Sequence, residues 1–268
     1  MECLGYGFPG KNMPPSPTLL ADAPETVPIP PLGIGPFVRL RVRFQKSDLI
    51  RWLSHHDLIR AMDRLLRRLA FPVVHSQGFR PNPAMVFALS LPLGALGSEE
   101  IVEIDLHGLD WNGPELLVQL NQQAPPGLKF LDIQLVGNKD RARVESLVYR
   151  TLVPQSLLAK TSLLIPEIVA KEALWVHRQD PAAPPMVFVD PNSRFAKNLK
   201  SSLQNLTLVD GFQLEITLVP QPEGTLKPIE ILAMLDWPLS SKDFPAPQWE
   251  RTRLNIAGDD SLERLRTS

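Results

Sequence analysis

Residues 52–57 read Trp-Leu-Ser-His-His-Asp, and the fold of the chain can be worked out from this stretch in both directions. Ser54 is a residue type that favours a helix N-cap. Asp57 stands three residues later in the capping-box position, where glutamate or glutamine is more usual. This spacing predicts a helix from His55 to about Ala70. Its core-facing stripe is formed by Ile59, Met62, Leu66 and Leu69, with Leu58 and Leu65 beside it.

The opposite side of this helix is basic. His56, Arg60, Arg64, Arg67 and Arg68 recur there at helical spacing. From Arg39 to Arg80 the chain has ten Lys/Arg and three acidic residues, a net charge of +7, whereas the whole chain of 268 residues has a net charge of −1. This block therefore indicates a phosphate-binding surface; the alternative is an ordinary solvated face.

The segments around the helix predict an α+β unit. Phe37 to Phe44 alternates apolar and basic residues, which predicts a half-buried strand with an outer row of Arg39, Arg41 and Arg43. After the helix, a fixed loop over 76–83 leads to a strand over 84–91, a turn over 92–98, a strand over 99–106, a helix over 113–124 and a strand over 128–136. This order is that of the ferredoxin-like βαββαβ unit.

The second half suggests the same order with additions. Strands are expected over 144–153, 174–178, 186–190, 205–219 (broken at Asp210-Gly211) and 249–256, with helical segments over 156–172 (interrupted by Pro166), 194–203 and 227–235. The predicted fold class is α+β, with tandem ferredoxin-like units over 37–138 and 144–257, the second decorated. Residues 1–36 read as a disordered proline-rich tail and 258–268 as a polar tail.

Composition excludes several classes of protein. Cys3 is the single cysteine, so no disulfide, Cys-based zinc site or iron–sulfur site forms within this chain. No apolar run is long enough to span a membrane, and residues 1–11 do not resemble a secretory signal. A cytoplasmic protein that contacts no membrane is expected, and no cofactor is assigned.

His55 and His56 are the candidate catalytic residues. At a helix N-terminus the imidazole favours its neutral form, which could act as a general base on a ribose hydroxyl or help to hold a phosphate. The alternative is that one histidine packs under a loop and the other is solvated. A mixed metal site with Asp57 and His75 is conceivable from spacing, but no metal is assigned.

The loop over 76–83 is the second candidate binding element. Gln77, Gly78, Phe79, Arg80 and Asn82 could contact a ligand, and the backbone N–H groups near Gly78 could face a phosphate. Two prolines remove donors, however, and no lysine follows as in a P-loop. A rigid connection between two strands is an equally good interpretation.

These segments together resemble the radical-SAM-linked family of the DUF2344 type. That family combines a Ser-His-x-Asp helix start, a Gly-Phe-x-Pro-x-Pro loop and a Pro-Leu-Gly turn. The likeness covers residues 37–106 well and continues weakly through 224–232. The positions that match are Ser54, His55, Asp57, Gly78, Phe79, Pro81 and Pro83, with the turn at 92–94, whereas Asn82 replaces an expected histidine and His56 an expected leucine.

The resemblance implies an accessory module that stands after or beside a radical-SAM enzyme. The three-cysteine cluster motif of such enzymes is absent, so this chain does not carry that chemistry alone. A looser likeness, at the level of fold only, links it to CRISPR repeat-processing endoribonucleases.

Three functional hypotheses follow. The first is a non-catalytic module that presents a substrate to a radical-SAM enzyme and binds RNA through Ser54, Asp57 and the arginines of the basic face together with Arg80. The second is a metal-independent endoribonuclease with His55 or His56 as base and Arg80 or His75 as the second catalytic group. The third is a protein–protein adaptor that uses the proline-rich tail.

Overall fold

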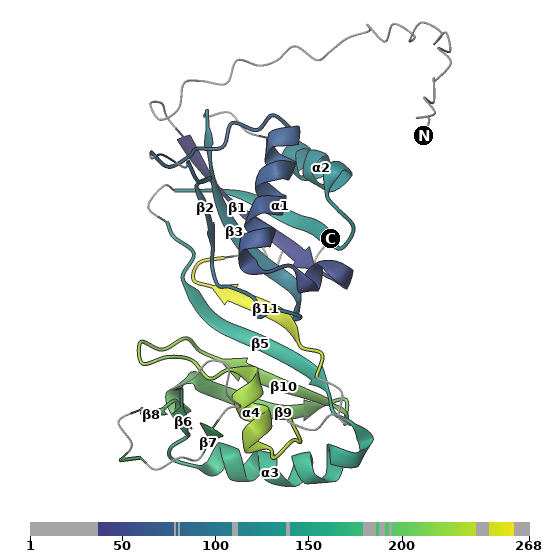
Figure 1. The fold of residues 1–268 in the computed structure, drawn as a ribbon, viewed down its shortest axis with the longest axis vertical. Helices are drawn as coiled ribbons and strands as arrows, with labels where there is room; N and C mark the ends of the chain where they lie inside the picture. The colour runs from purple at the N-terminus through teal and green to yellow at the C-terminus, as the bar shows by residue number, and fades with distance from the viewer. Residues whose placement is uncertain are drawn as a thin grey trace, which may run out of the picture.

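The fold is built around one long, mostly antiparallel sheet (Figure 1). The computed structural model describes residues 37–77, 79, 81–108, 112–137, 140–178, 186–187, 191–192, 195–239 and 247–259. The predicted tail over 1–36 and most of the tail over 258–268 lie outside these residues. The protein is α+β, as predicted, with a core dominated by the sheet.

The first half alternates strands and helices. Its elements are β1 (Phe37–Lys46), the 3-10 helix η1 (Asp48–Trp52), α1 (His55–Arg68), β2 (Met85–Phe87), β3 (Leu96–His107), α2 (Gly113–Gln123) and β4 (Leu128–Val136). The predicted strand over 84–91 is much shorter than expected, because after Phe87 the chain leaves the sheet and crosses toward the start of α1, where the N–H of Gly94 donates to the carbonyl of Arg51.

The second half carries more short elements. These are β5 (Val144–Leu152), η2 (Gln155–Leu157), α3 (Leu158–Ala170), β6 (Trp175–His177), β7 (Met186–Val187), β8 (Ala196–Asn198), η3 (Lys200–Ser202), β9 (Leu203–Val209), β10 (Gln213–Leu218), α4 (Pro228–Met234) and β11 (Glu250–Ile256). Pro166 does not interrupt α3, in which Thr161 and Ile168 are buried and Thr161 accepts a hydrogen bond from the Trp237 indole at 3.1 Å. The helical segment predicted over 194–203 is instead β8 followed by the single turn η3.

The strand order of the large sheet is β4-β1-β3-β11-β5-β10-β9, with β2 also paired to β3. All pairs are antiparallel except β3 with β11, which pair in parallel over only two positions, Glu250 with Leu96 and Arg251 with Gly97. The last strand of the chain therefore lies in the middle of the sheet. β6, β7 and β8 form a separate three-stranded sheet.

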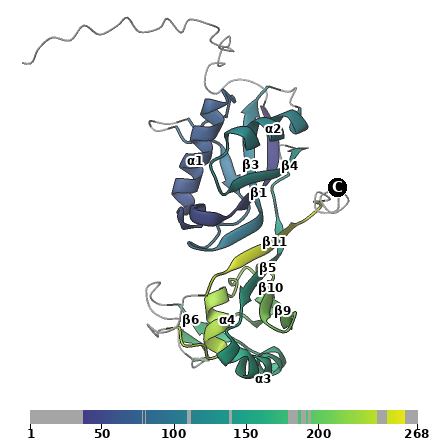
Figure 2. The ribbon, with the colours of Figure 1, turned by 90° about the vertical axis from the view of Figure 1, so that its right-hand side faces the viewer.

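Two hydrophobic clusters hold the helices to the sheet. In the first half, α1 contributes Leu58, Met62, Leu65 and Leu66, which pack with α2 against β1, β3 and β4. In the second half, α3 and α4 pack on β5, β9 and β10. Helices α1 and α4 lie on the same side of the sheet, and β5 and β11 run between the two halves (Figures 1 and 2).

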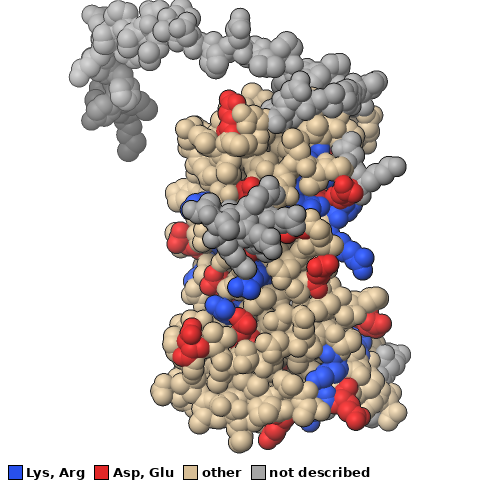
Figure 3. Space-filling model, turned by 180° about the vertical axis from the view of Figure 1, so that it is seen from behind, with Lys and Arg blue, Asp and Glu red and all other residues tan. Residues whose placement is uncertain are grey.

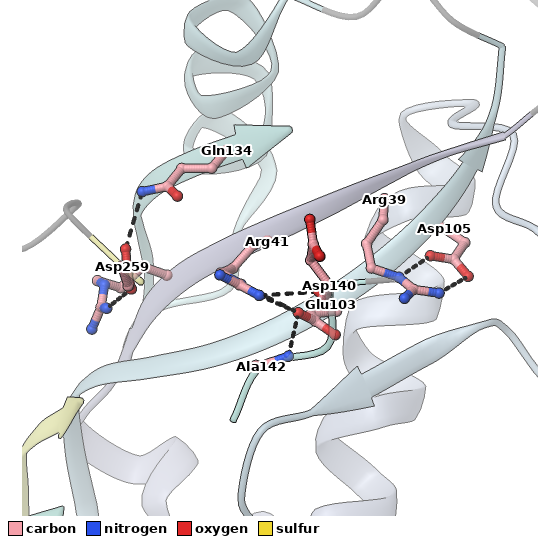
Figure 4. Close-up of polar contacts among 9 residues, drawn as sticks. Arg39, Arg41, Glu103, Asp105, Gln134, Asp140, Ala142 and Asp259 are labelled. Atoms are coloured by element: carbon pink, nitrogen blue, oxygen red, sulfur yellow. Dashed lines mark hydrogen bonds and ion pairs between the residues drawn. The ribbon is translucent and has the colours of Figure 1, made fainter. Parts of the chain in front are cut away.

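The arginine row of β1 is buried, which corrects the predicted solvent-facing row. Arg39 pairs with Asp105 at 2.8 Å and Arg41 with Glu103 at 2.9 Å (Figure 4). Arg43 pairs with Asp259. The segment after β4 covers this row, since Arg41 donates to the carbonyl of Asp140 and the N–H of Ala142 donates to Glu103. The alternation was read correctly, but both faces of β1 are interior.

The outer surface on this side carries mixed charge. Seen from behind, Lys/Arg and Asp/Glu side chains lie interspersed rather than in a patch of one sign (Figure 3). Among the described residues, no helix is long and apolar enough to cross a membrane.

Candidate binding surface on helix α1 and at its amino terminus

The start of α1 has the predicted cap. The Oγ atom of Ser54 accepts a hydrogen bond from the backbone N–H of Asp57 at 3.2 Å, and its hydroxyl donates to Oδ2 of Asp57 at 2.7 Å. This second bond lowers the pKa of the Asp57 carboxyl below its usual range. Asp57 thus serves the cap and also accepts from the Arg60 guanidinium at 3.4 Å. Its oxygens are committed to the helix itself.

His55 packs inward at this end of the helix. Its ring meets Phe87 edge-on at 4.9 Å between centroids and lies near the buried side chains of Lys46 and Glu100. Burial lowers the pKa of His55, and the neighbouring His56 and Lys46 lower it further. The neutral imidazole expected from the helix N-terminus is therefore favoured by packing as well. His56, one position on, is exposed.

We expect the pH dependence of stability to report on His55. Its folded pKa is below the unfolded value of about 6.5, so the unfolded chain binds the proton more readily. The stabilising contribution is complete above about pH 6.5 and decreases as the pH falls toward the lowered folded value. Between about pH 7 and pH 5, urea unfolding should therefore show a larger loss for the wild type than for His55→Gln.

The exposed neighbour provides the control for this measurement. His56→Gln should keep most of the wild-type difference between the two pH values, because burial, the largest cause of the lowered pKa of His55, is left in place. If His55→Gln and wild type lose the same free energy of unfolding over this range, the packing of His55 does not disfavour its protonation.

Lys46 lies beside His55 in the interior, at the end of β1. It is 2% exposed, and its ammonium group donates to the carbonyls of Leu53 at 2.9 Å and Arg51 at 3.3 Å. Burial lowers the pKa of Lys46, and Glu100 opposes this shift. The sequence analysis did not single out this lysine; a basic residue at an inward-facing position of a strand is the signal that could have identified it.

The Pro-Leu-Gly turn lies against the segment that precedes α1. Gly94 has φ +80, its N–H donates to the carbonyl of Arg51 at 3.0 Å, and a Cβ atom there would lie 2.8 Å from the Trp52 ring. This glycine is therefore required both by backbone conformation and by space. The structure brings the turn and the start of α1 together, although they are about 40 residues apart in the sequence.

Four arginines on α1 face solvent. Arg60, Arg64, Arg67 and Arg68 are all exposed, as predicted from their spacing. Arg60 pairs with Asp57 and Arg67 with Asp63, while Arg68 donates to the carbonyl of Gln123. Among the described residues, Arg64 and Arg68 have no carboxylate within ion-pair distance. The face therefore keeps an excess of positive charge after its local pairs are formed.

The loop over 76–83 lies at the other end of the helix. The N–H of Ser76 donates to the carbonyl of Asn82, and the N–H of Asn82 donates to the Ser76 hydroxyl. Gln77, Phe79 and Asn82 are exposed, Phe79 completely. Gly78 and Arg80 lie outside the described residues. Internal hydrogen bonds thus close the loop at its base.

His75 belongs to this far end and not to the His55 site. Its Nδ1 contacts the carbonyl of Val73 at 2.7 Å, and its Nε2 lies 3.2 Å from Nη2 of Arg67. From His55 to Arg67 the helix rises about 18 Å. The structure therefore does not bring His75 together with His55 or His56. Among the described residues, no group of three His, Cys, Asp or Glu side chains could hold a metal ion.

The most deeply buried charges were missed by sequence reasoning. Arg251 of β11 is fully buried and forms a bidentate pair with Glu100 of β3; it also contacts the Tyr149 hydroxyl at 3.2 Å. Burial lowers the pKa of Arg251, but Glu100 and then Tyr149 outweigh it, so the net shift is upward. No local pattern connects two residues 151 positions apart.

A comparison with protein-family models gives a match over most of the described chain. A family model described as an uncharacterized protein conserved in bacteria, DUF2344, matches residues 39–228. This span includes β1, α1, the loop over 76–83, the turn at Gly94 and the start of α4. No curated protein matches the chain.

Proposed function

The chain belongs to the DUF2344 family, and from its structure we propose that it is a non-catalytic accessory module that binds RNA through the exposed face of α1. In this proposal the module works beside a radical-SAM enzyme in the cytoplasm and presents the RNA as substrate. The contacts run mainly from arginine to phosphate, so binding depends strongly on salt.

The contrast between two sets of arginines carries this proposal. Arg39, Arg41 and Arg43 of β1 are buried and each is matched to a carboxylate, which is the arrangement of structural charges. On α1 the four arginines exceed the two local acids and are solvated. A helix face that keeps unpaired guanidinium groups in water is suited to neutralising phosphates.

The strand order supports the finer reading of the fold. In a ferredoxin-like unit the four strands lie in the order 4-1-3-2, all antiparallel. The order β4-β1-β3-β2 in the first half and β11-β5-β10-β9 in the second both follow this pattern, with a helix after the first and before the last strand of each unit. We propose on this basis that residues 37–138 and 144–257 are two such units joined through β3 and β11.

The lowered pKa of His55 favours a second candidate function, a metal-independent endoribonuclease. A neutral imidazole could act as general base. Its charged neighbours are already engaged, since Lys46 donates to two carbonyls and Glu100 pairs with Arg251. The module without catalysis is therefore the better supported function.

We expect the wild-type protein to bind bulk cellular RNA with an affinity that falls steeply with salt. Four arginine–phosphate contacts to single strands correspond to a slope of about −3 in log K against log salt. The Arg60/Arg64/Arg67/Arg68→Ala variant should lose most of this slope and bind at least about tenfold more weakly at low salt. Filter binding or fluorescence anisotropy over a salt series measures both quantities.

A variant with the same charge change elsewhere provides the control. Arg141, Arg143, Lys160 and Lys197 are exposed and lie off α1. Their joint replacement by alanine should retain most of the affinity and slope. Equal losses in both variants would indicate unspecific attraction, and the absence of binding by wild type would favour the adaptor. RNA cleavage that depends on His55 or His56 would favour the enzyme.

A further inference from the structure

A second candidate site lies where the two halves of the large sheet meet, away from the exposed face of α1. A cavity of about 630 Å³ lies over the middle of the large sheet, between the segment that follows β2 and the start of α4. Its floor is formed by Leu147 and Tyr149 of β5 and Leu218 of β10, all of them buried. This volume is within the range of pockets that hold small organic ligands.

Two chain segments form opposite rims, and an arginine holds each of them, the buried Arg251 on one side and the half-buried Arg178 on the other. Arg251 donates to the carbonyls of Leu89 and Ser90 in the segment that leaves β2. Arg178 donates to the carbonyl of Thr225 at 2.7 Å and pairs with Glu230 of α4. The rims are therefore fixed from behind by Arg–Glu pairs, and the cavity is preformed rather than created by a ligand.

The wall of the cavity is apolar because its polar groups are used elsewhere. The Tyr149 hydroxyl is engaged by Arg251, so the ring serves as wall, with Trp249 meeting it edge-on at 6.4 Å. The side chains of Ser90 and Thr225 are the neutral polar groups of the rims. The rims also bring together segments of the family motifs, namely the Pro-Leu-Gly turn at Pro92 and residues 225–229.

Lys227 gives the cavity its charge preference. It is exposed at the rim, and no carboxylate of the described residues lies within ion-pair distance of its ammonium group. Among the described residues that line the cavity there is no aspartate or glutamate. A ligand entering here would place apolar groups over Tyr149 and Leu147 and meet a single cation at the entrance.

We propose that this cavity binds a small molecule with an apolar body and one anionic group, the anion lying at Lys227. The site is separate from the arginines of α1 and does not depend on RNA binding. The Arg60/Arg64/Arg67/Arg68→Ala variant therefore retains it, which keeps the two proposals distinguishable.

Three ten-carbon probes with the same chain test the proposal: decanoate, decanol and decylamine, each below its micelle-forming concentration. Calorimetric titration of the full chain should give binding in the order decanoate, decanol, decylamine, with decanoate about tenfold tighter than decanol. Lys227→Gln should remove the difference between decanoate and decanol while leaving decanol unchanged. Ile229→Trp, which places an indole at the rim, should abolish binding of all three.

Two results would overturn the site. Decanoate bound as tightly by Ile229→Trp as by wild type would locate the probe elsewhere on the protein. Equal affinity of wild type for decanoate and decylamine would remove the anion preference assigned to Lys227. Circular dichroism and urea unfolding of both variants establish that the fold is retained.

Discussion

Replacing Arg251 by methionine is expected to lower the free energy of unfolding by about 3–5 kcal/mol, because Glu100 then stays buried without its partner. Arg251 is fully buried and Glu100 is 2% exposed. The same guanidinium also satisfies the carbonyls of Leu89 and Ser90 and contacts Tyr149. The substitution therefore removes contacts to β3, to β5 and to the segment after β2 at the same time.

Removing both charges should cost much less than removing one. In the Arg251→Met/Glu100→Leu variant no unpaired charge remains, and we expect at least half of the lost stability to return. Urea unfolding followed by tryptophan fluorescence measures the three free energies. If the double variant were as unstable as the single one, the carbonyls of Leu89 and Ser90, and not the buried carboxylate, would account for the effect.

Gly97→Ala is expected to lower the free energy of unfolding by about 2–3 kcal/mol, although only one methyl group is added. A Cβ atom at Gly97 would lie 2.6 Å from Cγ and 2.7 Å from Oε1 of Glu100. Glu100 cannot move aside without leaving Arg251, because both of its oxygens accept from that guanidinium. The new methyl group therefore displaces Glu100 and weakens its ion pair with Arg251.

A double-mutant cycle tests this coupling. In the Glu100→Ala/Arg251→Met background the clash is removed, and Gly97→Ala should cost less than about 1 kcal/mol. Gly211→Ala provides a control for backbone strain alone, since Gly211 has φ +76 and nothing lies within 4 Å of its Cβ position; a cost of about 1 kcal/mol is expected. An equal cost of Gly97→Ala in both backgrounds would rule out the coupling to Glu100.

Local signals in the sequence predicted the local structure well. The cap at Ser54 and the apolar stripe through Met62 and Leu66 set the start and the buried side of α1, because both depend on residues within one or two turns. The exposure of the arginines on α1 followed from the same periodicity. The break at Asp210-Gly211 between β9 and β10 was also predicted, from its turn chemistry.

Features that depend on distant partners were not predicted. The alternation in β1 could not show that its arginines are buried, because that depends on acids in β3; Glu103 and Asp105, spaced by two, are the signal that could have indicated the pairing. The strand predicted over 84–91 ends early, at Phe87, because the distant Arg251 binds the carbonyls of Leu89 and Ser90 and holds that segment out of the sheet. The position of β11 between β3 and β5 has no local signature.

Because β11 lies between β3 and β5, the large sheet cannot be completed until β11 has been synthesised. Residues 250–256 emerge after β3 and β5, yet in the large sheet these two strands are joined through them. Until then one edge of β5 is unpaired along most of its length and Glu100 lacks its guanidinium. Strand edges of this kind attract other chains. Chaperone contact during translation should therefore concentrate on the β5 edge and end when β11 pairs there and Arg251 docks.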